Sequence, residues 1–164
     1  MVLPEAEVQR WEEISKGTEF EKINIALAGV TRFDSVKSGL TLVNEPGVVA
    51  IHDAVRPLVS VETIQRVFTE AEKSEAAIPV VELKDSLRQL TGASSNSVER
   101  DTFSIAQTQQ CFSSQLLLKA YQQPFQQKFT DDASVVEEMG QRIALVSGNN
   151  ENIKITTAED LKIA

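Results

Sequence analysis

The chain has 164 residues, and 16 Lys and Arg against 24 Asp and Glu give a formal net charge of −8. Hydrophobic residues make up 41% and charged residues 24%, as in an ordinary globular domain. The acidic balance excludes a general nucleic-acid binder, because the phosphate backbone attracts clustered Lys and Arg. The single cysteine, Cys111, forms neither an internal disulfide nor a thiolate metal cage, which favours a reducing compartment.

Membrane and secretory signals are not found in the sequence. No apolar run approaches the roughly 20 residues that a membrane helix requires. The start, MVLPEAEVQR, lacks the basic and apolar regions of a signal peptide. We therefore expect a cytoplasmic protein with no membrane partner. The length, without repeats or linkers, predicts a single domain over residues 1–164.

Helical and strand-like segments alternate along the chain. It opens on what resembles the end of a strand at Leu3, followed by a helical pattern over 6–14. Short β-branched runs predict strands over 47–55, 76–83, 142–148 and 152–157. Apolar spacing predicts helices over 61–75, 113–121 and 134–140. In the last of these, Ser134 and Glu137 match a capping box and Gly140 is placed to end the helix. This alternation predicts an α/β domain with a mostly parallel sheet.

The segment 83–107 fits neither a helix nor a plain core strand. Its middle, TGASSNS (91–97), is a turn cluster, so the flanks are expected to form a long hairpin that projects from the sheet. Such an arm exposes strand edges and needs a partner to cover them, which suggests an oligomer. On composition alone, its Lys84 and Arg100 are ordinary solvated charges.

The clearest candidate for chemistry is IHDAVRP (51–57), where His52, Asp53 and Arg56 follow directly after an apolar run. In open parallel sheets, ligands bind beyond the carboxyl ends of the strands. An Asp there suits a hydrated Mg²⁺, and an Arg three residues on suits a phosphate. The alternative is that Asp53 caps the next turn and Arg56 pairs with a surface acid. His52 has no triad partner or co-ligand, so we expect it to pack or to make a structural hydrogen bond.

Two further clusters leave alternatives open. In FTDDASVVE (129–137), Thr130 and the free N–H groups of a helix start suit a phosphate. Asp131 and Asp132 are equally explained as ordinary first-turn acids. Lys154 lies within the predicted strand 152–157, where it is either an edge residue or aimed at an anion.

Six motifs in order resemble the 2-C-methyl-D-erythritol 4-phosphate cytidylyltransferase family. They are AGVTRFDSVKSGL, IHDAVRPLV, AAIPVVELKDSL, VERDTFSIAQTQQCF, FTDDASVVEEMG and NIKITTAEDL. The resemblance implies an α/β, Rossmann-like nucleotidyltransferase sheet with a projecting β-arm that builds a homodimer. It also implies a reaction of the non-mevalonate route to isoprenoids, in which CTP and methylerythritol phosphate give the CDP-alcohol and pyrophosphate, with Mg²⁺.

The resemblance implies roles for residues that face CTP and the metal. Gly29 and Ser35 match positions that hold the cytosine and ribose of CTP. Asp53 matches the metal-binding aspartate, and Ala54 and Arg56 match its neighbours that line the site.

Other matched positions face the second substrate and the phosphates. Ser86 stands where the family usually has Thr in a K-D-T motif, and it keeps the hydroxyl for substrate contact. Arg100 matches the arm arginine that reaches across the dimer to methylerythritol phosphate. Thr108 and Thr130 match site threonines, the latter near the substrate phosphate. Lys154 matches a lysine that contacts the phosphates.

The sequence also departs from the family pattern. The family begins with a strand and a glycine-rich loop carrying an Arg and a Lys, so an N-terminal βαβ portion of about 30 or more residues is expected to be missing. The chain is likewise expected to stop inside the final helix. Ala28 replaces a family Gly, and Gln109 replaces the Pro of Q-T-P-Q.

Two other functions remain as alternatives. Pentitol phosphate cytidylyltransferases share the motifs around 52–57 and 152–157, although KDS and VERDTF favour the methylerythritol enzyme. A non-catalytic dimerisation or binding module would keep the arm without CTP-dependent turnover.

Overall fold

The computed structural model describes all 164 residues. The chain divides into two compact units, which we call unit 1 (Met1–Gly47 and Ser113–Gly140) and unit 2 (Val48–Phe112 and Gln141–Ala164). The single domain expected over 1–164 stays a prediction. None of the helices is both long enough and apolar enough to span a membrane.

Unit 1 is mainly helical. Its elements are β1 (Val2–Leu3), α1 (Glu5–Ser15), the 3₁₀ helix η1 (Glu19–Lys22), β2 (Ala26–Leu27), α2 (Arg32–Leu40), α4 (Ser114–Ala120) and α5 (Asp132–Glu137). Strands β1 and β2 pair in parallel, with Val2 opposite Ala26. The strand that ends at Leu3 and the helix over 6–14 are therefore confirmed.

An aromatic cluster forms the core of unit 1. The apolar face of α2 buries Phe33 together with Val36 and Leu40, which the helical repeat places on the same side. The Phe33 ring stacks on Tyr121 with 4.7 Å between ring centroids, and on Phe129 with 5.8 Å. These contacts attach α2 to the chain at the end of α4 and to the segment before α5.

The start of α5 corrects one prediction. The N-cap is Asp131, and Ser134 is the third helical residue, so the helix begins at Asp132 rather than at Ser134. Asp131 Oδ1 accepts from the Ser134 backbone N–H at 2.9 Å, and Ser134 Oγ accepts from the Asp131 N–H at 3.2 Å. The capping box is formed by Asp131 and Ser134, so the predicted pair of Ser134 and Glu137 is wrong. The helix ends at Glu137 rather than at 140, and Gly140, at φ 80°, ends the turn that follows it.

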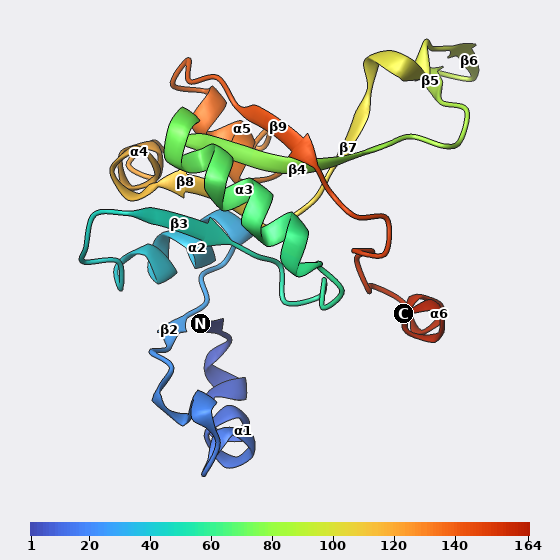
Figure 1. The fold of residues 1–164 in the computed structure, drawn as a ribbon. Helices are drawn as coiled ribbons and strands as arrows, with labels where there is room; N and C mark the ends of the chain where they lie inside the picture. The colour runs from blue at the N-terminus through green and yellow to red at the C-terminus, as the bar shows by residue number, and fades with distance from the viewer. The chain divides into compact units, whose positions relative to one another are not determined.

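Unit 2 packs one helix on a sheet and carries a hairpin. Its elements are β3 (Val48–Ile51), α3 (Val61–Ser74), β4 (Ala76–Glu82), β5 (Arg88–Thr91), β6 (Ser94–Ser97), the 3₁₀ helix η2 (Arg100–Thr102), β7 (Ser104–Ala106), β8 (Gln110–Ser113, its last residue in unit 1), β9 (Ala144–Ser147) and α6 (Ala158–Ile163). Helix α3 lies across the sheet (Figure 1) and buries Val67 and Ala71 against Ala77 and Cys111. Cys111 is thus a small core residue.

The sheet is mixed, so the expectation of a mostly parallel sheet is wrong. The central strand β4 pairs in parallel with β9, but antiparallel with β8 through Ala76–Ala77 and with β7 through Val80–Glu82. Hydrophobic runs locate strands without giving their direction, and here the returning arm reverses the chain. Pro79, which has no N–H, lies where β4 changes partner from β8 to β7, and its carbonyl accepts from the Gln107 N–H at 2.9 Å.

The projecting hairpin is confirmed. Strands β5 and β6 pair antiparallel, with Thr91 opposite Ser94, and stand away from the sheet (Figure 1). The turn consists only of Gly92, at φ 60°, and Ala93. The wider turn cluster predicted over 91–97 is therefore wrong, because Ser94–Ser97 forms a strand.

Candidate active site

The candidate site in unit 2 begins where β3 ends. After Ile51 the chain turns, and the Arg56 N–H donates to the Asp53 carbonyl at 3.0 Å. His52 Nε2 lies 2.9 Å from the Arg56 carbonyl, which only accepts, so we assign the ring proton to Nε2. His52 Nδ1 then accepts from the Thr108 hydroxyl at 3.4 Å. His52 therefore makes structural hydrogen bonds, as predicted.

Two cations flank the carboxylate of Asp53. Its Oδ2 lies 3.3 Å from Lys154 Nζ and 4.0 Å from Arg56 Nε. The side chain of Asp53 is 16% exposed and that of Lys154 47% exposed, so the pair opens to solvent on the lysine side. The Asp53 backbone N–H donates to Thr108 Oγ1 at 3.1 Å. Arg56 thus pairs with Asp53 itself rather than with a distant surface acid.

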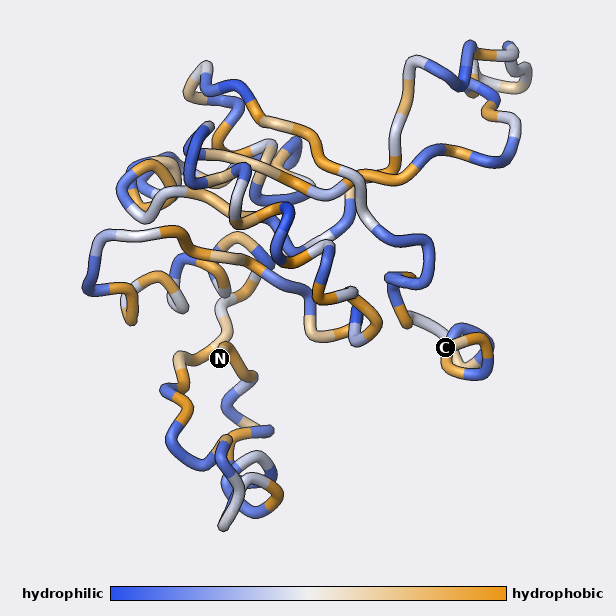
Figure 2. The backbone as a smooth tube through the Cα atoms, viewed as in Figure 1, coloured by the Kyte–Doolittle hydropathy of each residue, from blue (hydrophilic) through white to orange (hydrophobic).

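Lys154 reaches this site from an irregular segment, so the predicted strand over 152–157 is wrong. Figure 2 shows hydrophobic residues along β9 and a hydrophilic chain directly after it. The Ile155 N–H donates to the Val55 carbonyl at 2.8 Å. This backbone–backbone bond ties the segment that carries Lys154 to the Asp53 turn.

Sequence reasoning missed two buried amides beside these residues. Asn152 is 0% exposed, and its Nδ2 donates to the Thr108 carbonyl at 2.7 Å. The Asn152 carbonyl accepts from Arg56 Nη1 at 2.7 Å and from Gln107 Nε2 at 3.3 Å. Polar residues in loops are expected at the surface, and no local pattern indicates that these two are buried.

In unit 1, two of the predicted site residues contact each other directly. The Gly29 N–H donates to Ser35 Oγ at 3.1 Å, and that hydroxyl donates to the Thr31 carbonyl at 2.9 Å. A Cβ on Gly29 would come within 2.9 Å of the Asp34 carbonyl carbon and closer still to the Asp34 Cβ. The loop before α2 therefore requires glycine at this position.

Thr130 precedes α5 and is exposed, next to a buried ion pair in the same unit. Arg32 donates from Nη1 and Nη2 to the two carboxylate oxygens of Asp132 at 3.1 and 2.7 Å. The Tyr121 hydroxyl donates to Asp132 Oδ1 at 2.5 Å. Burial raises the pKa of Tyr121 far above its usual value, and the negative charge of Asp132 adds to the shift. Asp132 is therefore more than an ordinary first-turn acid.

The remaining predicted residues lie on the arm and in the turn. Ser86 is exposed, and Arg100 Nη1 donates to the Lys84 carbonyl at 2.7 Å, two residues before Ser86 in the chain. Ala54 follows Asp53 and is exposed. The structure thus brings together Asp53, Arg56, Thr108 and Lys154, and it separately joins Gly29 to Ser35.

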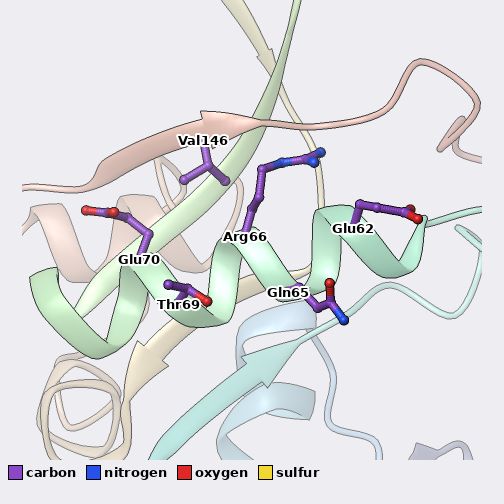
Figure 3. A pocket seen from close by; sticks show the side chains of 6 residues that line it. All are labelled: Glu62, Gln65, Arg66, Thr69, Glu70 and Val146. Carbon is purple, nitrogen blue, oxygen red and sulfur yellow. The ribbon is translucent and has the colours of Figure 1, made fainter.

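A groove on α3 lies outside this cluster. Figure 3 shows its lining residues, Glu62, Gln65, Arg66, Thr69 and Glu70 of α3 with Val146 of β9. Arg66 reaches toward β9, where its Nε donates to the Ser147 carbonyl at 3.0 Å. With its arginine held and acids on both sides, the groove has no excess of positive charge for a phosphate.

Comparison with known proteins identifies the family. Residues 1–164 match the family described as 2-C-methyl-D-erythritol 4-phosphate cytidylyltransferase. The chain belongs to this family. A relative of that name from Bacteroides fragilis is 51% identical over all of this chain and 75% of its own length. One from Bacteroides thetaiotaomicron is 48% identical over 99% of this chain and 75% of its own.

Solved structures of the cytidylyltransferase family share the fold. The enzyme from Thermus thermophilus is 32% identical with a TM-score of 0.77, covering 90% of this chain and 75% of that one. The 4-diphosphocytidyl-2C-methyl-D-erythritol synthase from Anaerococcus prevotii is 26% identical with a TM-score of 0.86, covering 99% and 74%. The expected α/β, Rossmann-like nucleotidyltransferase fold is confirmed.

The donor set around Asp53 fits the cation that the cytidylyltransferase family implies. No group of three or more His, Cys, Asp or Glu side chains forms a protein cage for a metal. Mg²⁺ in phosphate-transfer sites uses one or two carboxylates and takes its other ligands from water and substrate phosphates. A single strand-end carboxylate with two adjacent cations matches that pattern, because the cations suit the same phosphates.

Proposed function

We propose that this chain transfers the cytidylyl group of CTP to 2-C-methyl-D-erythritol 4-phosphate, in isoprenoid precursor synthesis. The main observation in support is the Asp53 carboxylate flanked by Lys154 and Arg56 at the end of β3. In this proposal, Lys154 and Arg56 face the reacting phosphates, and Asp53 and Thr108 keep the two cations and the metal in place. The two substrates are inferred from the family to which the chain belongs.

The reaction needs no protein nucleophile. An oxygen of the sugar phosphate attacks the α-phosphorus of CTP, and the bond from that phosphorus to the bridging oxygen of pyrophosphate breaks. The electron pair leaves with pyrophosphate, so negative charge grows on the leaving group. Catalysis then consists of alignment and charge stabilisation. Lys154 and Arg56 supply the positive charge.

Asp53 has two tasks in this scheme. Its carboxylate would hold Mg²⁺, which when bound neutralises phosphate charge. The same carboxylate orients Lys154 Nζ at 3.3 Å. The Thr108 hydroxyl accepts from the Asp53 N–H, so it fixes the backbone that carries this carboxylate.

The other matched residues each have a proposed contact with a substrate. Gly29 and Ser35 hold the cytosine and ribose of CTP, and Thr130 lies near the substrate phosphate. Ser86 and Arg100, both exposed on the arm, contact the sugar phosphate in a cytoplasmic homodimer built by that arm. An exposed arginine in η2, on the arm that carries the hairpin, suits a contact with substrate on a second copy.

Pyrophosphate release from CTP and methylerythritol phosphate with Mg²⁺ tests the proposal. We expect Lys154→Met to lower turnover by about a hundredfold, since a preorganised charge at the reacting phosphates is lost. Lys162→Met, which removes an exposed lysine in α6, is the matched control and leaves turnover unchanged. Circular dichroism checks the fold of each variant. Equal turnover in the two folded variants, or no release by the folded chain itself, would overturn the proposal.

A further inference from the structure

The segment that carries Lys154 is held by side chains rather than by a sheet. From Asn149 to the start of α6 its backbone–backbone bonds are local, apart from the one from the Ile155 N–H to the Val55 carbonyl. Lys154 itself is half exposed. The position of its ammonium group therefore depends on what fixes the preceding residues.

The buried side chain of Asn152 supplies that attachment. Its Nδ2 bonds the Thr108 carbonyl at 2.7 Å, and its own carbonyl accepts from Arg56 Nη1 at 2.7 Å. Asn152 therefore joins the three parts of the chain that carry Thr108, Arg56 and Lys154. It lies two residues before Lys154, so a shift of Asn152 moves the lysine.

Gln107 strengthens this attachment from the other side. Its Nε2 donates to the carbonyls of Asn149 and Asn152 at 2.9 and 3.3 Å, so one amide holds both ends of the loop. The side chain is 4% exposed. A Cβ on Gly148 would collide with the Gln107 amide oxygen, so Gly148 leaves the space that this side chain fills.

Three buried polar atoms here have no hydrogen-bond partner: Arg56 Nε, Gln107 Oε1 and Asn152 Oδ1. Leaving a buried polar atom unpaired is costly, and such atoms need an explanation. All three belong to side chains that converge on the Asn152 residue. In both amides the N–H₂ group donates and the oxygen is left unpaired, so the orientation of each side chain serves the carbonyl groups to which it donates, those of Asn149, Asn152 and Thr108.

We infer that Asn152, supported by Gln107, is a positioning residue that sets Lys154 and Arg56 against Asp53. The inference rests on the proposed function of those three residues. Neither amide touches substrate in this scheme. Their effect on phosphate transfer passes through the Lys154 ammonium group and the Arg56 guanidinium group.

The test follows Lys154 directly in the free protein. Lysines carrying ¹³C-methyl groups keep their charge, and the Lys154 signal is identified by its loss in Lys154→Arg. Asp53→Asn should shift this signal, because it removes the ion-pair partner. We expect Asn152→Ala to shift it in the same direction by at least half as much. The matched control is Asn150→Ala, an exposed asparagine of the same loop, which should leave the signal in place.

A second variant covers a failure of Asn152→Ala to fold. Gln107→Met keeps the side-chain volume but removes the donor, so the Lys154 signal should shift there too. In pyrophosphate release, Asn152→Ala should lower turnover at least about fivefold in the parent chain and by a smaller factor in Lys154→Met, because the part that passes through Lys154 is already lost there. An unmoved Lys154 signal in both variants, or additive losses of turnover, overturns the inference. The proposed function fails separately, if Lys154→Met retains full turnover.

Discussion

Replacing Asp132 by Asn tests whether the buried ion pair organises unit 1. The Asp132 side chain is 0% exposed and accepts three hydrogen bonds, two from Arg32 and one from the Tyr121 hydroxyl. Asparagine has the same shape but offers one acceptor oxygen and no charge. The N–H₂ half of the asparagine amide cannot bond the guanidinium group of Arg32, because both groups are donors. At least one charge-assisted bond is therefore lost.

The magnitude follows from burial and bond type. A hydrogen bond to a charged group contributes about 1.5–3 kcal/mol, and breaking a fully buried pair costs about 3–5 kcal/mol. The Arg32 side chain is 36% exposed, so water compensates part of the loss. We expect the free energy of unfolding to fall by about 3 kcal/mol. For a chain of this size, that corresponds to a melting midpoint lower by roughly 6–12 °C.

Urea unfolding followed by circular dichroism measures the effect. Asp101→Asn is the matched control, because the Asp101 side chain is 86% exposed and lies 3.6 Å from Arg100 Nε. That variant should unfold like the parent chain. Tyr121→Phe should cost less than Asp132→Asn, and the double variant less than the sum, since the bond from the Tyr121 hydroxyl is charge-assisted only while residue 132 is a carboxylate. If Asp132→Asn matched Asp101→Asn in midpoint and slope, the ion pair would not be stabilising and the reasoning would fail.

Three further outcomes follow from the structure. Gly29→Ala should lower the free energy of unfolding by about 1–3 kcal/mol, because the added Cβ collides with Asp34. The control is Gly47→Ala, whose added Cβ meets nothing within 4 Å and which should leave urea unfolding unchanged. Burial raises the pKa of Cys111 from 9.0 to about 12. At pH 8, Ellman's reagent should therefore leave the thiol of the folded chain unmodified and should label it once urea unfolds the chain. Rapid labelling of the folded chain would contradict this. The thiol of the unfolded chain ionises at a lower pH than the buried thiol, so the free energy of unfolding should fall as pH rises from 9 towards 12. Cys111→Ala should make this fall with pH less steep. An equally steep fall in the variant would show that Cys111 does not cause it.

The helices and strands that the sequence predicted well are those whose structure is decided by neighbouring residues. In α3, the apolar residues recur at helical spacing from Val61 to Ala71, and the helix spans Val61–Ser74 against a predicted 61–75. Strand β4 spans Ala76–Glu82 against a predicted 76–83. In both cases burial of one continuous apolar face decides the structure, and that face is visible in the sequence.

The wrong predictions depend on partners that are distant in sequence. The segment 152–157 alternates apolar and polar residues as a strand does, yet Ile155 finds only one backbone bond, to Val55. Strand direction in the sheet is likewise set by how the arm returns the chain. The error at α5 is local instead: the pattern predicts Ser134 as the cap, whereas the N-cap is Asp131, three positions earlier.

Some residues of the candidate site could likewise be identified from the sequence, and others could not. Asp53 and Arg56 were identified from the residues alone, because they follow an apolar strand within five positions. Lys154 lies about a hundred positions further on. From the residues alone it is either an edge residue or one aimed at an anion, and its match to a family motif favours the phosphates. No sequence pattern indicated Gln107 or Asn152, because their contribution to the site depends on the distant carbonyl groups to which they donate.

The irregular backbone at Lys154 has a physical advantage over the strand that was expected. A strand residue projects perpendicular to its sheet, whereas the phosphates of open α/β sheets bind beyond the strand ends. A chain released from the sheet and bonded to Val55 returns its lysine to the end of β3, where Asp53 lies. Such a segment lacks ladder hydrogen bonds, so its position must come from side chains. The buried amides of Gln107 and Asn152 meet that requirement, and the error in secondary structure at 152–157 thus points to the residues that organise the site.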